Sequence, residues 1–201
     1  MRRMAKTGLA LLTVALVGAG VALERFLAYG ISARDQPTSM EAFCARQLRR
    51  LAIPRSARDA RSPLAPALPA LARARAHFAD HCASCHGNDG RGKTMIGRNL
   101  YPKAPDMTLP DTQNLSDGEI FSIIENGVRL TGMPAWGQGS EADRAQTWEL
   151  VHFIRHLPTI TPEEVTEMGA MNPRSREEWE QEEAERKFLE GGAAPTSHSN
   201  H

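Results

Sequence analysis

Two cysteines and a histidine lie close together in the run Cys82-Ala83-Ser84-Cys85-His86. Thiols at this spacing can reach the two vinyl groups of one porphyrin, and the imidazole that follows can bind its iron. C-x-x-C-H is therefore the attachment signature of a c-type haem. We expect one haem c, covalently attached through Cys82 and Cys85, with His86 as an axial ligand of the iron.

Other uses of these cysteines fit the sequence less well. A thioredoxin-like redox pair would need a βαβ pattern around the C-x-x-C, whereas the flanking residues indicate helix and loop. A structural zinc site would need a second pair of ligands, and the remaining cysteine, Cys44, is far upstream. Cys44 would then be an unreactive residue on a linker helix or half of an intermolecular disulfide.

The segments around the motif are predicted to be helices joined by loops. Residues 71–81 have a helical pattern that leads into Cys82, and glycines then break the chain into a loop through residue 115. Ser116 begins a capping box, so a short helix should run from there to Gly127. A turn-rich loop precedes a helix over 140–157, whose expected buried residues are Trp148, Val151, Phe153, Ile154 and Leu157.

This order of elements resembles a class I c-type cytochrome over about residues 70–158. The resemblance rests on a helix, C-x-x-C-H-G, a glycine-rich loop, a short helix, a Gly-Met-Pro loop and a final helix. Ala74 and Phe78 stand where that family places a small residue and an aromatic, although the small residue there is usually glycine. Phe153 and Leu157 stand where its last helix crosses its first. The resemblance implies an all-α fold and outer-sphere electron transfer.

The resemblance also implies the second axial ligand of the iron. Met133 lies in the Gly-Met-Pro loop, which is similar to the family's methionine-ligand loop, and enough chain separates it from His86 to wrap a haem. Met95 is too close in sequence to cross the ring, and Met107 lacks that loop context. We therefore expect His86 and Met133 to be the two axial ligands.

Supporting roles are open for several neighbouring residues. Pro102 or Pro105 could supply the backbone carbonyl that orients His86. Three side chains could bond the haem propionates: Trp136, Arg98 and Tyr101. His152 and His156 are expected to be surface residues of the last helix.

The amino terminus is basic and then apolar. Residues 1–6 include three basic side chains, and Gly8 to Leu23 contain no charge. This pattern predicts a membrane anchor in a bacterial inner membrane, with the amino terminus in the cytoplasm and the haem domain in the periplasm. The alternative is cleavage near Ala28-Tyr29-Gly30, which would leave a soluble periplasmic protein.

The predicted fold is all-α, a cytochrome c-like haem domain with an N-terminal transmembrane anchor and extra C-terminal helices. By composition the chain divides into a signal-anchor segment (1–30), an Ala/Arg/Pro-rich linker (31–69), a cytochrome c domain (70–158), an acidic helical extension (159–192) and a disordered tail (193–201). Within the linker, residues 40–52 have an amphipathic helical pattern that could lie on the bilayer or on the domain. Capping boxes predict two helices in the extension, near 162–171 and 176–190.

These features predict a periplasm-facing electron-transfer protein and not an enzyme. No nucleotide fingerprint, second metal motif or nucleophile with an evident base is present. The alternative is a non-catalytic cytochrome subunit of an extracytoplasmic oxidoreductase complex. Expected partners are redox proteins, a membrane respiratory complex among them. No nucleic-acid partner is expected, because the basic surplus lies in the leader and linker without interleaved aromatics.

Local charge predicts where a partner would dock. Between Arg91 and Lys103, the loop after the motif holds Arg91, Lys93, Arg98 and Lys103 and no acidic residue, and Arg129 precedes the Met133 loop. A positive ring beside the haem edge would steer an acidic partner towards it.

Overall fold

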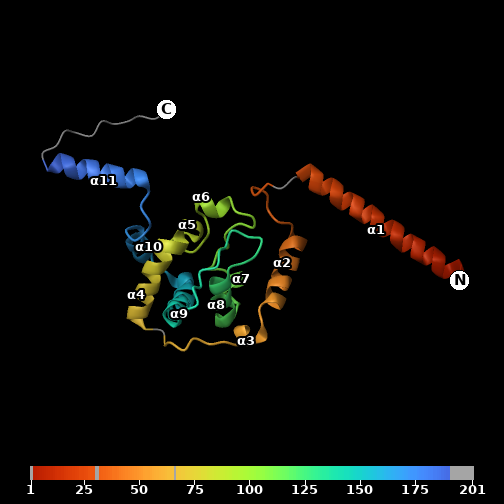
Figure 1. The fold of residues 1–201 in the computed structure, drawn as a ribbon, viewed down its shortest axis with the longest axis horizontal. Helices are drawn as coiled ribbons and strands as arrows, with labels where there is room; N and C mark the ends of the chain where they lie inside the picture. The colour runs from red at the N-terminus through yellow and green to blue at the C-terminus, as the bar shows by residue number, and fades with distance from the viewer. Residues whose placement is uncertain (1, 30–31, 66, 191–201) are drawn as a thin grey trace.

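The computed structural model describes residues 2–29, 32–65 and 67–190, and over these residues the chain is helical with no strand. Figure 1 shows α1 and α11 extending away from a central body that the other helices form. In chain order the elements are α1 (Arg2–Tyr29), α2 (Ser39–Ala52), α3 (Arg55–Arg58), α4 (Leu68–His77), the π-helical turn η1 (Phe78–Cys82), α5 (Ala83–His86), α6 (Met95–Arg98), α7 (Pro110–Gln113), α8 (Asp117–Asn126), α9 (Glu141–His156), the 3-10 turn η2 (Leu157–Thr159), α10 (Pro162–Gly169) and α11 (Arg176–Leu189). The all-α prediction is confirmed. The predicted tail, 193–201, lies outside the described residues.

Side-chain caps set the helix starts that the sequence predicted. The Ser116 hydroxyl accepts a hydrogen bond from the Glu119 backbone N–H, and the Glu119 carboxylate accepts one from the Ser116 N–H. Thr161 and Ser175 begin α10 and α11 with the same capping box, and Ser140 caps α9 with its hydroxyl. Each cap satisfies backbone donors that the first helical turn leaves without partners.

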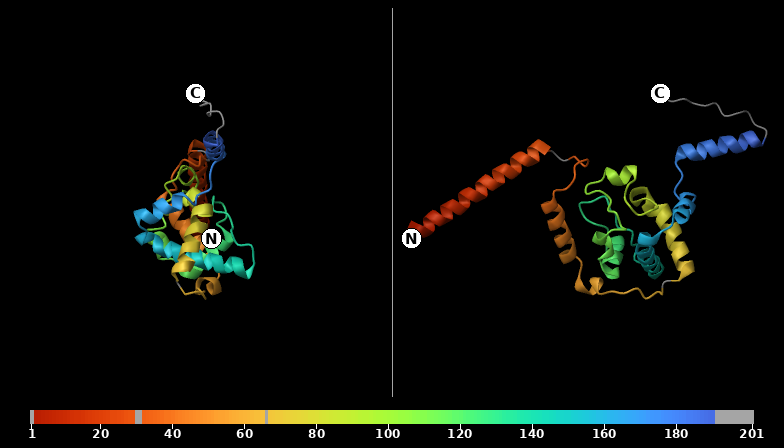
Figure 2. Two further views of the ribbon diagram at one scale, coloured as in Figure 1. Left: turned by 90° about the vertical axis from the view of Figure 1, so that its left-hand side faces the viewer. Right: turned by 180° about the vertical axis from the view of Figure 1, so that it is seen from behind.

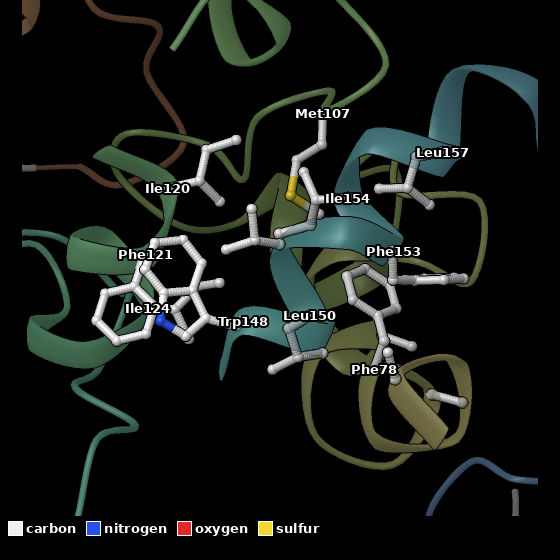
Figure 3. Close-up of a cluster of buried hydrophobic side chains, with 14 of the residues drawn as sticks. Phe78, Met107, Ile120, Phe121, Ile124, Trp148, Leu150, Phe153, Ile154 and Leu157 are labelled. Carbon is white, nitrogen blue, oxygen red and sulfur yellow. The ribbon is translucent and has the colours of Figure 1, made fainter. Parts of the chain in front are cut away.

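The core forms where α4 and η1 cross α9. The rings of Phe78 and Phe153 lie 5.0 Å apart, and Ala74, 1% exposed, leaves room for the crossing. The rings of Phe121 and Trp148 stack at 4.2 Å and join α8 to the same core (Figure 3). All five residues predicted to be buried on the last helix are buried: Trp148, Val151, Phe153, Ile154 and Leu157.

Side chains from α9 also hold the loop before α8. Arg155 donates from Nε to the Asp117 carboxylate at 2.8 Å and from a terminal nitrogen to the Gln113 carbonyl at 2.7 Å. The Gln113 amide nitrogen donates in turn to the carbonyls of Met107 (2.7 Å) and Ile154 (2.9 Å). These bonds replace water for buried backbone carbonyls and keep the loop against the helix.

The residues assigned to a linker contact the domain in the structure. The Ser116 hydroxyl donates to the Arg58 carbonyl at 2.6 Å, and Ile53 is only 8% exposed. A Cβ atom at Gly118 would lie 1.9 Å from the Ala57 carbonyl oxygen, so α3 touches α8 backbone to backbone. The amphipathic pattern over 40–52 corresponds to α2, which lies beside the body in Figures 1 and 2.

The expectation that His152 and His156 are plain surface residues is wrong. Both are half-buried. The His152 Nε2 atom lies 3.0 Å from the Ser62 hydroxyl, and the His156 Nε2 atom lies 3.0 Å from the Glu164 carboxylate. They fail the expectation because other segments pack over α9, residues 62–64 from far upstream and α10 from just beyond it, and a helical pattern does not show such contacts.

The two C-terminal helices behave differently. From α10, Met168 is fully buried in the core, and Glu164 and Glu167 pair with Arg75 at 3.6 and 3.0 Å. By contrast, α11 projects from the body in both figures, with Trp179 60% exposed. The acidic extension therefore begins as part of the packed domain and ends as a free helix.

The apolar helix α1 is long enough to cross a bilayer. Its candidate span, Gly8–Ala28, has 21 residues and a mean hydropathy of 1.8, and none of it is buried. At about 1.5 Å per residue such a span matches a hydrocarbon core of roughly 30 Å. The same composition also suits a signal sequence.

We expect Phe153→Ala to reduce the free energy of unfolding by roughly 3–5 kcal/mol, because it leaves a cavity at the α4–α9 crossing. Denaturant titration measures the loss. The same substitution at Phe188, 49% exposed on α11, should cost about 0.5 kcal/mol or less. Equal losses would contradict this account of the core.

Candidate functional site

A large apolar cavity lies between the C-x-x-C-H segment and the loops on either side of α8. It contains about 1210 Å³ of space not filled by atoms, part of it open to solvent. Cys82, Cys85, His86 and Met133 all line it, so the structure brings the four predicted site residues to one place. The other lining residues are Arg49, Phe78, His81, Leu100, Pro102, Lys103, Ala104, Pro105, Met107, Thr112, Leu115, Ile120, Ile123, Ile124, Val128, Thr131, Gly132, Pro134, Trp136, Leu150 and Ile154.

The C-x-x-C-H segment leaves the first helix through a change of helical pitch. The π-helical turn η1 runs from Phe78 to Cys82, and α5 then carries the motif to His86. Such turns are rare and tend to occur at functional sites. Here the turn keeps Phe78 in the core while Cys82, four residues later, faces the cavity.

Close backbone contacts hold the loop after His86. Gly87 ends α5 with a φ of 74°, and the Gly92 N–H donates to the His86 carbonyl at 2.7 Å. A Cβ atom at Gly97 would lie 2.2 Å from the Cys85 carbonyl oxygen, so α6 lies directly against the motif. The Thr94 hydroxyl also donates to that carbonyl at 3.0 Å. These contacts stop the motif from moving away from the cavity wall.

Neither Cys82 nor Cys85 is in a disulfide, and the Cys82 thiol is buried away from water. Burial, with a smaller contribution from Cys85, raises the pKa of the Cys82 thiol to about 12. Redox-active C-x-x-C pairs instead have a thiol whose pKa is lowered. A zinc site also lacks support, because no group of three or more His, Cys, Asp or Glu side chains is placed to hold a metal within the described residues.

His86 is suited to bind a metal ion through the lone pair of a neutral imidazole. Burial lowers the pKa of its imidazole, so the ring keeps a free lone pair at neutral pH. Its Nδ1 atom is buried without a hydrogen-bond partner. Pro102 and Pro105 line the same cavity, but neither carbonyl bonds that nitrogen in this structure.

The loop that carries Met133 is held by its own backbone. The Val128 N–H donates to the Met133 carbonyl at 3.0 Å, and the Met133 N–H donates to the Thr131 hydroxyl at 3.1 Å. Gly127 permits the turn with a φ of 63°, and a Cβ atom there would lie 2.6 Å from the Ala135 nitrogen. The half-buried Met133 side chain is therefore presented to the cavity by a closed loop.

The other methionines considered from the sequence lie in different surroundings. Met95 is 76% exposed on α6. Met107 also lines the cavity, but it is 6% exposed and packs among core side chains beside Ile154 (Figure 3). Its environment is that of a core methionine.

The charged residues of the cavity were not all predicted. Among the described residues that line it no carboxylate occurs, and the long cationic side chains are Arg49 and Lys103. Trp136 lines the cavity as expected, whereas Arg98 is exposed and Tyr101 donates its hydroxyl to Glu41. Arg49 was missed because its segment was assigned to a linker, although the amphipathic pattern of 40–52 was a signal that it packs.

The cavity suits a flat apolar group that carries negative charge at its edge. Its walls are largely aliphatic and aromatic, the two thiols and the neutral imidazole lie together, and its two long cations have no acidic neighbour on the wall. A haem has an apolar macrocycle, two vinyl groups and two propionates, so the residues present fit it.

Comparison with known proteins agrees with this fit. Residues 69–154, a little under half of the chain, match the model of the family described as cytochrome C oxidase, cbb3-type, subunit III. The sequence matches no curated protein.

We expect Gly127→Ala to destabilise the Met133 loop, because the new Cβ would clash with backbone atoms at a positive φ. Gly139→Ala is the matched control, since Gly139 has a φ of 86° but open space around it. The control should cost about 1 kcal/mol through backbone strain, and Gly127→Ala about 1–3 kcal/mol more through the clash. Denaturant titration compares them, and equal losses would contradict the close packing of this loop.

Proposed function

We propose that this chain, whose residues 69–154 form a c-type cytochrome domain that transfers electrons through haem c, carries one covalent haem with His86 and Met133 as its axial ligands. Supporting the proposal is the convergence of Cys82, Cys85, His86 and Met133 on one apolar cavity. When bound, the haem supplies a one-electron iron couple, and a His/Met pair raises its potential and leaves no open coordination position.

The protein's own residues would attach the haem and exclude water from it. Cys82 and Cys85 would form the two thioethers, which fix the macrocycle against η1 and α5. Phe78, Leu150 and Ile154 would exclude water from its apolar face. Lower water access strengthens every electrostatic interaction at the site and therefore lets nearby charges tune the potential.

We further propose that the domain lies on the periplasmic side of a bacterial inner membrane. The span Gly8–Ala28 supports an anchor, and the basic residues before it favour a cytoplasmic amino terminus. Covalent haem attachment through C-x-x-C-H also fits an extracytoplasmic domain. Cleavage of the segment would give a soluble periplasmic protein with the same site.

A second candidate is a cytochrome subunit of an extracytoplasmic oxidoreductase complex. The name of the matching family refers to an oxidase subunit, and α11 leaves the body with Trp179 and Phe188 exposed. Mild detergent extraction and gel filtration separate the two candidates. An electron shuttle would elute alone, whereas a subunit would elute with its partner chains.

The haem assignment predicts one covalent c-type haem per chain in a pyridine haemochrome spectrum. Cys82→Ala or Cys85→Ala should weaken attachment, because each removes one thioether. Cys44→Ala, on the exposed face of α2, should leave haem content unchanged. Complete extraction of the haem by acid-acetone would contradict covalent attachment.

The ligand assignment predicts a weak near-infrared sulfur-to-iron band in the ferric protein. Met133→Ala should abolish the band and open a position for small ligands. Met95→Ala should leave it intact, and so should Met107→Ala, although the latter should also lower stability by roughly 2–5 kcal/mol because its side chain is buried. Persistence of the band in the Met133 variant would move the ligand elsewhere.

The docking prediction can now be restricted to charges that do not hold the segment before the domain in place. Lys103 Nζ donates to the carbonyls of Ala33 (3.3 Å) and Arg34 (3.0 Å), so reversing its charge would also disturb that contact. Lys93 comes before α6 and Arg98 is its last residue, and both side chains are exposed beside the motif. Arg98 Nε donates to the Thr94 carbonyl at 3.2 Å, a bond within the same turn, so reversing its charge does not disturb a contact with residues 33–34. They are therefore the better pair to reverse.

We expect Lys93→Glu with Arg98→Glu to slow electron transfer to the native partner several-fold at low salt, and the difference to shrink as ionic strength rises. Arg186→Glu with Lys187→Glu changes the net charge equally on α11 and is the control. If only the control slows transfer, the partner docks on α11 instead.

A further inference from the structure

Residues 33–64, which come before the matched domain, contact it at several points along their length. Near the start of this segment, two backbone carbonyls accept from Lys103, and in α2 the Glu41 carboxylate accepts from the Tyr101 hydroxyl. Arg46 pairs with Asp111 at 3.5 Å. Further on, the Arg58 carbonyl accepts from the Ser116 hydroxyl at 2.6 Å. The Leu64 carbonyl lies 3.2 Å from the His152 Nε2 atom. Residues 33–64, called here the N-terminal cover, therefore have one defined path across the domain.

The cover places a single long cation in the haem cavity. Arg49 lines the cavity from α2, while its neighbour Arg50 is exposed to solvent. The Nε atom of Arg49 is buried and has no hydrogen-bond partner. A buried donor without an acceptor costs about 1–3 kcal/mol, and more when it is charged. This position therefore calls for an acceptor inside the cavity.

The acidic residues near Arg49 do not supply this hydrogen-bond acceptor. Glu119 and Asp111 are the carboxylates that act on Arg49, and burial still lowers the pKa of the guanidinium. The Glu119 carboxylate accepts from the Ser116 N–H, and Asp111 pairs with Arg46. Arg49 makes no ion pair with either in the described part of the chain.

Lys103, the other long cation of the cavity, is already engaged. Its ammonium has three donors, and two of them bond the carbonyls of Ala33 and Arg34. Arg49 thus keeps the greater free donor capacity. A guanidinium matches a carboxylate with two parallel hydrogen bonds, which an ammonium cannot form.

We propose that the N-terminal cover, which lies outside the matched domain, closes one side of the haem cavity and that Arg49 binds a propionate carboxylate of the haem. The inference rests on the proposed haem function. Arg49 would neutralise the propionate in a poorly hydrated setting and so favour the reduced iron, which carries one positive charge less. The segment that follows the membrane anchor would in this way help to set the reduction potential.

The test is a reduction potential measured by equilibrium titration on the full-length holoprotein. Arg49→Gln should raise the ferric-to-ferrous ratio at a fixed potential at least tenfold, which is a fall of about 59 mV for one electron. Arg49→Lys should recover part of the change because it keeps the charge. Arg50→Gln removes an equal charge from the same helix and should change the ratio less than twofold.

A second variant tests whether the cover carries the effect. Gly118→Ala places a Cβ 1.9 Å from the Ala57 carbonyl oxygen and should displace α3 without touching the cavity wall. Its ferric-to-ferrous ratio should rise in the same direction as that of Arg49→Gln. The double variant should change little beyond Arg49→Gln alone, because both act on one interaction. Fully additive changes would overturn the role of the cover.

Haemochrome spectra of the unsubstituted protein and each variant separate this inference from the proposed function. If the unsubstituted protein carries no covalent haem, the proposed function fails. If every variant carries haem and Arg49→Gln behaves as Arg50→Gln does, only the role of Arg49 fails. Should Arg49→Gln not accumulate, Arg49→Lys is compared with Arg50→Lys. A larger shift for Arg49→Lys supports the inference, and equal potentials overturn it.

Discussion

The crossing of α4 and η1 with α9 is the contact on which the rest of the structure depends. Phe78 packs on Phe153 at 5.0 Å, and the small side chain of Ala74 lets the two helices approach. The C-x-x-C-H motif follows Phe78 within a single π-helical turn and α5, so its position is fixed by that packing. From the other helix, Leu150 and Ile154 complete the same cavity wall. One apolar contact therefore orients both the attachment site and the surface it faces.

Backbone contacts without intervening side chains hold the loops around this core. The close approach of Gly97 to the Cys85 carbonyl fixes one loop, and the turn at Gly127 fixes the loop of Met133. Because a methyl group does not fit at either position, α6 can lie directly against the motif and the Met133 loop can close on itself. Such close packing suits electron transfer, since a site that moves little between oxidation states loses little energy to reorganisation.

Charge is distributed differently at three places in the chain. The cavity holds cations and no carboxylate among the described residues, which suits an anionic cofactor edge. On α10, Glu164 and Glu167 are used internally, because they pair with Arg75 and join this helix to α4. On α11, Glu180 pairs with Arg176 and Glu183 pairs with Lys187, both within the helix. These carboxylates are exposed to solvent. The described carboxylates of α11 thus form an acidic surface that a partner could reach.

Local patterns in the sequence were enough to predict the helix starts at Ser116, Ser140, Thr161 and Ser175, the buried face of α9, and the haem c that C-x-x-C-H implies. Each depends on neighbours within about one or two helical turns, where spacing and capping chemistry suffice. The tertiary structure was needed to show that residues 33–64 pack on the domain, that His152 contacts Ser62, and that Arg49 lines the cavity with its Nε atom buried. These contacts join residues far apart in the chain, and a proline-rich, charged composition does not reveal the surface on which it packs.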